Sequence, residues 1–410
     1  MAEKDCPKLR PVQVGSDYQN GQHLLILSDP LGLTENAIAL PANLAHLLNL
    51  CDGTRNIPTL KSALELRTGM VLSIEYLNKF FALLDNAFLL ENKRFDKAYR
   101  DAVSQFRAAP ARSPIMLGTS YQENPKWIER QFQEYIDQLP VQRQRASRQS
   151  TVRGLISPHI DFQRGGCTYA EVWHRAAQAV RSADLAIVLG TNHQYAESMI
   201  TLTRQSYATP WGIVPNADDI IDTLARELGD GIFSYELNHR MEHSVEAAVT
   251  WLHFLTKHGK RSPRIVPIIC GSLTRFIEGD ISPGDDENIS RFIDIIRTAT
   301  SNRRTIVIAA GDLAHVGPAF GDGHIIDQAE KLRIGDSDRE LITLITNGDA
   351  EGAFQLVNEE NDRRRICGLS PIYLTLRLLG ETRGEVTGYA QCPADQQFTS
   401  LVSICGIVFS

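Results

Sequence analysis

Three histidines follow short apolar runs that have the length of β-strands. They are His159 after the run 154–156, His193 after 185–189 and His315 after 305–310. Alternation of such runs with helical patterns is typical of an α/β sheet, in which ligands bind at the carboxyl ends of the strands. A single loop histidine more often serves packing or hydrogen bonding. Three of them at one sheet edge predict a shared metal or catalytic pocket, because imidazole binds metals and moves protons near neutral pH.

Cys367 is the candidate thiolate of this pocket. It precedes a helical run with Pro371 in its first turn. Arg363, Arg364 and Arg365 lie just before it and are separated from it only by Ile366. The positive end of the helix dipole and the arginine charges should favour the thiolate, the form that binds soft metals and attacks electrophiles. A free cysteine is also commonly a small buried apolar residue. The other six cysteines lack this setting and are expected to be structural.

His243, Asp312 and Asp161 extend the set of candidates. Glu242 and His243 begin a predicted helix at 240–255, so His243 is a candidate for proton transfer, although a water-facing position explains it as well. Asp312 follows the run 305–310, and Asp161 lies two residues after His159. Two histidines with one carboxylate suit Fe(II) oxygenase chemistry, whereas two histidines with a thiolate suit Cu(I), Zn or Fe. The third ligand is therefore open between Cys367 and a carboxylate.

The elements that must position these residues are expected to form an α/β domain over residues 113–410, with a central sheet flanked by helices. A fourth strand is predicted at 265–269, and an amphipathic helix within 117–139 opens the domain. No GxSxG motif is present, which argues against hydrolysis through a serine triad.

Residues 1–95 are predicted to form a separate, winged-helix-like α+β module. Strands are expected at 24–27, 37–40 and 87–91, and helices at 44–50, 57–67 and 73–85, with Gly69 as a C-cap and Ser73 as an N-cap. The third helix carries only Lys79 as a cation, which favours peptide or protein binding over DNA binding. The stretch 96–112, rich in alanine, arginine and proline, is expected to be a linker.

Composition excludes several classes of protein. The 410 residues carry a net charge of -7, so binding to nucleic acid or to an anionic membrane has no long-range electrostatic support. Seven scattered cysteines argue against a disulfide framework or a zinc site built from four cysteines. The first ten residues show no secretory signal, and no apolar run approaches the roughly 20 residues of a membrane helix. We therefore expect a cytoplasmic protein with neither nucleic acid nor membrane as a partner.

Eight ordered motifs resemble those of the Memo family, whose bacterial members are also called AmmeMemoRadiSam system protein B. The motifs are SPHIDFQRGGCTYA, VLGTNHQ, YATPWGIVP, EHSVEAAVTWL, VPIICG, AAGDLAH, ICGLSPI and GYAQCPADQQFTSLVSICG. The resemblance implies a fold like that of class III extradiol dioxygenases of the LigB type. It also implies that His159, His193 and Cys367 hold iron or copper, with His243, Asp312 and His315 lining the pocket. Ile160, Asp161 and Phe162 depart from the Ala-Gly-Tyr that follows the first histidine in many members.

The N-terminal module resembles PqqD-like winged-helix modules, which hold peptides, through the segments LLNLCDGTRN and LSIEYLNKFFALLDNAFLLEN. Together the two resemblances imply a metal-binding protein with redox or dioxygenase-like activity on an unidentified small-molecule or peptide substrate. The alternative is a non-catalytic adaptor that binds a peptide or a protein and works with a radical SAM protein. A winged-helix regulator that binds DNA is disfavoured by the charge balance.

Overall fold

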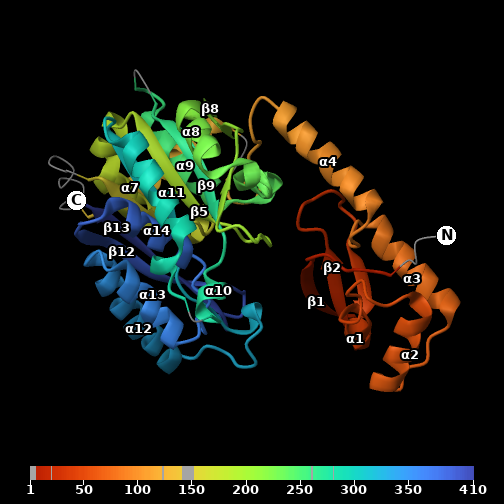
Figure 1. Cartoon of the computed structure of the whole chain (residues 1–410). Coiled ribbons are helices and arrows are strands. Elements are labelled where there is room, and N and C mark those ends of the chain that lie inside the picture. The colour runs from red at the N-terminus through yellow and green to blue at the C-terminus, as the bar shows by residue number, and fades with distance from the viewer. Residues whose placement is uncertain (1–5, 20, 122–123, 141–151, 260–261, 280) are drawn as a thin grey trace. The chain divides into compact units, whose positions relative to one another are not determined.

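Four parallel strands form the centre of the sheet in the larger part of the protein (Figure 1). In order across the sheet they are β4 (Gly154–Ser157), β10 (Thr305–Ala310), β5 (Leu185–Thr191) and β9 (Arg264–Cys270). Nearly all of their residues are buried, as required of strands that are covered by helices on both faces. The four strands predicted from the sequence are therefore confirmed.

The computed structural model describes residues 6–19, 21–121, 124–140, 152–259, 262–279 and 281–410. Residues 1–5, half of the segment read above for a secretory signal, lie outside this part. The chain divides into two compact units, Met1–Ala108 and Ala109–Ser410. Among the described helices, none has both the length and the apolar character that a membrane crossing requires.

Antiparallel strands extend the sheet of the larger unit on both sides, so that the sheet is mixed. β13 (Leu401–Phe409) pairs with β4 and carries β11 (His315–Val316) and β12 (Gly384–Pro393), while β6 (Ile200–Leu202) pairs with β9. None of these four strands is predicted from the sequence. The α/β class with a central sheet flanked by helices is confirmed.

Helices cover both faces of this sheet and enclose two apolar cores. One core packs against α5 (Pro125–Asp137), α7 (Phe162–Ser182) and α9 (Ser244–Thr256). The other packs against α8 (Asp218–Leu228), α11 (Glu287–Thr300), α12 (Gln328–Thr346), α13 (Ala350–Glu359) and α14 (Leu369–Leu379). Short elements complete the unit: β7 (Tyr207–Thr209), β8 (Gly212–Val214), α10 (Thr274–Ile277), and 3-10 turns at Asp230–Phe233, Glu236–Met241, Pro283–Asp285 and Pro318–Phe320.

The smaller unit combines a three-stranded antiparallel sheet with helices. The sheet has the order β1 (Gln13–Gln19), β2 (Gln22–Ser28), β3 (Ile38–Pro41), and the helices are α1 (Ala45–Leu48), α2 (Ile57–Thr68), α3 (Ile74–Asn86) and α4 (Lys93–Ala108), with a 3-10 turn at Ala42–Leu44. Gly69 ends α2 in the left-handed conformation, and the Ser73 hydroxyl accepts from the Tyr76 amide at the start of α3, so both predicted caps are confirmed. The strand expected at 87–91 is reduced to one bridge between Leu9 and Leu90.

The region expected to be a linker, 96–112, is helical as far as Ala108 and belongs to α4. Ala102 and Phe106 of this helix are buried, and its charged residues are exposed. Composition alone predicts a linker here, but apolar residues four positions apart stabilise an amphipathic helix once they have a surface to cover. The winged-helix assignment of the smaller unit stays a prediction.

The buried His239 predicts that the larger unit loses stability in acid. Burial lowers the pKa of His239 to about 4, and its two ring nitrogens lie 2.8 Å from the Tyr207 hydroxyl and 3.1 Å from the Thr201 carbonyl. Below pH 6.5 the unfolded chain binds a proton that the folded chain excludes, so the stabilisation is complete above pH 6.5 and is lost as the pH falls to about 4. A shift of this size corresponds to about 3 kcal/mol.

The measurement is urea unfolding between pH 4 and 7, followed by tryptophan fluorescence. All four tryptophans (Trp127, Trp173, Trp211 and Trp251) lie in the larger unit, so the signal reports that unit alone. We expect a shallower dependence on pH in His239→Gln. An identical slope in the variant and the wild type would contradict the assignment.

Candidate metal centre

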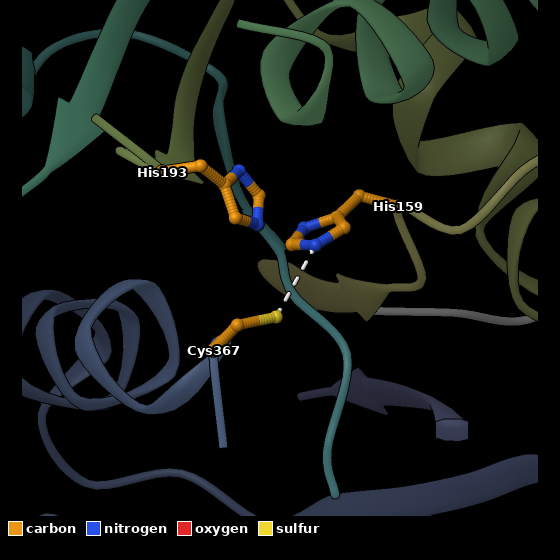
Figure 2. A group of neighbouring side chains, drawn as sticks. All are labelled: His159, His193 and Cys367. Atoms are coloured by element: carbon orange, nitrogen blue, oxygen red, sulfur yellow. Dashed lines mark hydrogen bonds between the residues drawn. The ribbon is translucent and has the colours of Figure 1, made fainter. Parts of the chain in front are cut away.

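His159, His193 and Cys367 come together at the carboxyl ends of the parallel strands. His159 follows β4, His193 follows β5, and Cys367 lies just before α14. Their ligand atoms all lie within 4.8 Å of one another. Figure 2 shows the two imidazole rings and the thiol directed toward one another, with His159 Nε2 lying 3.2 Å from Cys367 Sγ. The structure thus brings together the three predicted metal ligands.

The ring of His159 is held with its Nε2 atom toward the thiol. Its Nδ1 atom lies 3.1 Å from the Ala310 carbonyl oxygen, which can only accept, so Nδ1 carries a proton. The backbone amide of His159 donates to Asp312 Oδ1 at 2.9 Å. Histidines that bind metals commonly donate their second ring N–H to a carbonyl or a carboxylate in this way. His159 is therefore oriented as a ligand through Nε2.

Glu242 holds His193 in the same manner. Its carboxylate lies 3.0 and 3.1 Å from His193 Nδ1 and accepts from the backbone amides of His193 and Ser244. The Glu242 side chain is 1% exposed, whereas that of His193 is 37% exposed. The sequence names Glu242 only as the start of a helix. The sequence does show a carboxylate that precedes an apolar helix and lies beside the candidate His243. That this carboxylate holds the ring of His193 is seen only in the fold.

Glu242→Gln is expected to weaken metal binding without abolishing it. The amide keeps one acceptor for the ring of His193 but loses the second oxygen and the charge, and losing such a supporting contact typically costs about 10- to 100-fold in metal affinity. Competition with a coloured chelator measures the change. Glu236→Gln is the matched control, because Glu236 is an equally buried glutamate that accepts from Thr203 and the Arg204 amide away from the site. An equal loss in both variants would assign the effect to general destabilisation.

Charges within the site favour a thiolate paired with imidazolium. Burial opposes ionisation of Cys367, but the positive charge of His159 together with hydrogen bonds from His159 and His193 lowers its pKa to about 5. Burial likewise opposes protonation of His159, yet the Cys367 thiolate and Asp312 raise its pKa to about 9. Glu242 raises the pKa of His193 well above its usual value, against the effect of burial. The protonated rings of His159 and His193 thus supply the positive charge that a metal ion bound between these residues would supply.

The three arginines before Cys367 do not provide this charge, contrary to the prediction. Arg364 is buried and pairs with Asp338 and Glu360, and Arg365 pairs with Asp322 and donates to the His315 carbonyl. Arg363 is exposed. An arginine side chain is long, so its guanidinium group reaches partners several ångströms from the backbone. Its charge therefore need not lie near the residues that are adjacent in sequence. The imidazole rings stabilise the thiolate instead.

Two glycines allow the loop of Cys367 to contact the end of β10. A Cβ atom on Gly311 would lie 2.5 Å from Gly368 Cα, and one on Gly368 would lie 2.5 Å from the Asp312 carbonyl oxygen. The Gly368 amide donates to that same oxygen at 2.9 Å, and the Thr191 hydroxyl donates to the Cys367 carbonyl at 2.8 Å. The backbone of Cys367 and Gly368 is thus held at the ends of β5 and β10.

The other candidates lie around the three ligands. His243 stacks on His193 with ring centroids 5.0 Å apart, and burial lowers its pKa to about 4. Asp312 uses Oδ1 to hold the His159 backbone, and its Oδ2 lies 3.7 Å from His159 Nε2. His315 has Nδ1 within 3.1 and 3.2 Å of the Leu313 and Arg365 carbonyls, so Nδ1 carries a proton and Nε2 is left as an acceptor.

Asp161 has another use. Its side chain caps α7 by accepting from the Arg164 amide and pairs with the Arg164 guanidinium. Among the described residues, the groups of three donors close enough to hold one ion are His159, His193 and Cys367, and His193, Glu242 and His243. Neither group contains Asp161 or Asp312. The geometry favours Cys367 as the third ligand over either aspartate.

A cleft of about 570 Å³ opens beside the histidines. Its volume falls within the range of small-molecule sites. Polar and apolar residues both line it: His159, His193, His243, Asp312, His315, Asp161, Arg164, Thr119, Ser120, Ile115, Met116, Ile160, Ala319, Phe320, Ala394 and Val402. A small substrate in this cleft would contact His159 and His193, two of the three predicted ligands, together with the candidate proton carriers.

Comparisons with known proteins identify the family of this chain. Residues 112–408 match the family model described as Memo-like protein. A MEMO1 family protein of Aquifex aeolicus is 27% identical over 405 residues, covering 96% of this chain and 98% of the relative. A MEMO1 family protein of Methanosarcina barkeri is 25% identical over 289 residues, covering 68% of this chain and 92% of its own length. The first of these alignments also includes the smaller unit, whereas the family model begins after it. The family model spans most of the chain and contains every ligand candidate, so the chain belongs to the Memo family.

Proposed function

We propose that the chain binds iron or copper through His159, His193 and Cys367 and performs redox or dioxygenase-like chemistry on a small substrate. The orientation of the ligands carries the proposal: each histidine has its Nδ1 atom engaged by a fixed oxygen, which leaves Nε2 toward one thiolate. Two imidazoles and a thiolate suit Cu(I) and iron. Bound there, the metal ion would supply electron transfer and Lewis acidity. The resemblance noted from the sequence supports the same ligand set.

The residues beside the ligands can move protons. His315 presents Nε2 as an acceptor, because its Nδ1 proton is held by two carbonyl oxygens, and it lines the cleft. His243 is neutral near pH 7, since burial lowers its pKa to about 4, and it also lines the cleft. Either ring can accept a proton from a substrate hydroxyl group. Asp312 acts as a positioning residue for His159 rather than as a proton carrier.

The test is oxygen uptake by chain loaded with Fe(II) or copper, measured against a panel of catechols and other small phenols. We expect uptake that depends on both metal and substrate, and a loss of about 100- to 10,000-fold in His315→Gln, the range that general acid or base groups contribute. His258→Gln is the control, because the His258 side chain is 83% exposed. Metal-loaded chain that consumes no oxygen with any substrate would overturn the catalytic proposal.

The alternative is an adaptor that works with a radical SAM protein. Its support is the smaller unit, in which a three-stranded sheet and α1, α2 and α3 enclose a separate apolar core, as a PqqD-like winged-helix module that holds peptides would. The leading proposal, in contrast, includes a relation of the larger unit to class III extradiol dioxygenases. Binding of a labelled peptide by the chain, unaffected by His159→Ala, would favour the adaptor.

A further inference from the structure

β1 is the first strand of the sheet of the smaller unit, and no described strand pairs with its outer edge. It pairs with β2 over seven residues, from Gln13 opposite Ser28 to Gln19 opposite Gln22. Edge strands normally carry lysine, proline or a bulge, or are very short, because an open edge can pair with another chain. β1 has neither lysine nor proline nor a bulge and is seven residues long; its one charged residue is Asp17. The opposite edge, β3, is four residues long and ends in Pro41.

The backbone groups of alternate β1 residues point away from β2. Gln19 and Gln22 close the hairpin across two residues, and such a closing pair is hydrogen-bonded, so the neighbouring pairs alternate between bonded and non-bonded. Val14, Ser16 and Tyr18 therefore direct their N–H and C=O groups to the open edge. In agreement, the Tyr18 amide donates to its own neighbour, the Asp17 carboxylate, at 2.7 Å rather than to β2.

The same three residues lie on one face of the sheet, and two of them are large and apolar. Val14 is 57% exposed and Tyr18 is 72% exposed, although the ring of Tyr18 stacks on His23. Val14 is paired with Leu27, which is fully buried in the core of this unit. Val14 and Tyr18 thus lie on the same face of the sheet as the buried core residue Leu27, but at the outer edge of that face.

We propose that two copies of the chain associate through their β1 edges, antiparallel and centred on Ser16. In this register Val14 of each copy lies opposite Tyr18 of the other, and Ser16 lies opposite Ser16. All three outward-facing residues then form hydrogen-bonded pairs across the interface, with the Tyr18 amide exchanging its bond to the Asp17 carboxylate for one to the Val14 carbonyl of the other copy. Each pair of a β-branched and an aromatic side chain is a favourable cross-strand contact. The sequence QVGSDYQ is self-complementary about its centre, which argues for a second copy rather than an unrelated strand.

Charge selects the same register. Asp17 is the only charged residue of β1, and pairing centred on Ser16 places it opposite Gly15. Centring one residue later would place Asp17 opposite Asp17, and like charges directly opposite one another are destabilising. Centring one residue earlier would separate Val14 from Tyr18. The interface of one strand pair is smaller than stable dimers use, so association is expected to be weak and to depend on concentration.

The test is sedimentation velocity of the full chain over about a hundredfold range of concentration. We expect the mean mass to rise from the 45.7 kDa of one chain toward twice that value. Ser16→Pro removes an outward N–H while leaving the β1 to β2 hydrogen bonds in place, because proline is tolerated where the N–H faces solvent. It should weaken association at least tenfold, and so should Val14→Lys. Ser16→Thr keeps the N–H and is the matched control.

A chain that stays monomeric over the whole range overturns the proposal and leaves the edge to a strand of another protein. Association that is equally strong in Ser16→Pro and Ser16→Thr also overturns it, because the contact must then lie elsewhere. The proposal is independent of the metal centre, so His159→Ala should associate like the wild type.

Discussion

We expect the wild-type chain to retain a transition metal through anaerobic purification, and His159→Ala, His193→Ala and Cys367→Ser each to remove it. Each substitution leaves two protein ligands, and loss of a direct ligand should exceed the roughly 10- to 100-fold in affinity that a supporting hydrogen bond contributes. Elemental analysis gives the metal content, and electron paramagnetic resonance identifies iron or copper and its ligand field. For Cys367→Ser we also expect loss of any absorption band that arises from metal and thiolate.

The matched control for the thiol is Cys392→Ser. Cys392 is buried in the same unit, and its sulfur lies 3.5 Å from the Arg164 carbonyl, a contact that a hydroxyl can keep. Circular dichroism and thermal unfolding verify that the four variants are folded. Metal content that is equal in wild type and all three ligand variants would place the metal elsewhere. A wild-type chain that takes up neither iron nor copper under reducing conditions would refute the metal centre itself.

The central strands could be predicted from the sequence because their burial is complete. Each is a short run of apolar residues between polar clusters, and a parallel strand covered on both faces has no exposed positions to interrupt that run. His159 and His193 follow from the same rule, since the carboxyl ends of parallel strands meet at one edge. β12 is not predicted, because several of its residues are exposed and interrupt the apolar run. Its pairing with β13 begins at Pro393 and Leu401, and the pattern of apolar residues does not indicate the turn between them.

The orientation of the ligands could not be predicted. Nothing in the sequence says that Glu242 accepts from the ring of His193, or that Arg364 turns to Asp338 and away from Cys367. Long polar side chains have several rotamers of similar energy, and the fold selects among them through partners that are distant in sequence. For the same reason Asp161 was a plausible third ligand in sequence but serves as the cap of α7 in the structure.

Arg112→Ala is expected to destabilise the larger unit by about 3 to 5 kcal/mol, the typical cost of removing one partner of a buried ion pair. The side chains of Arg112 and Glu246 are 0% and 1% exposed and pair with each other. Arg112 also donates to the His239 and Glu242 carbonyls. Urea unfolding followed by tryptophan fluorescence measures the change. Arg130→Ala is the matched control: Arg130 pairs with Glu134 in the same unit, but both are largely exposed, so the expected cost is at most about 1 kcal/mol.

Arg112 matters to the site because its partner Glu246 lies on α9, the helix that begins two residues after Glu242. Glu246 of that helix accepts from the Ile115 and Met116 amides and from the Tyr121 hydroxyl, and Ile115 and Met116 line the cleft. Without the guanidinium, the Glu246 carboxylate stays buried with neutral donors only. Glu246→Gln in the Arg112→Ala background should therefore recover part of the lost stability, because it removes the uncompensated charge. If the double variant is no more stable than Arg112→Ala, the cost comes from the lost hydrogen bonds to the two carbonyls, and the helix start rather than the ion pair holds this wall of the cleft.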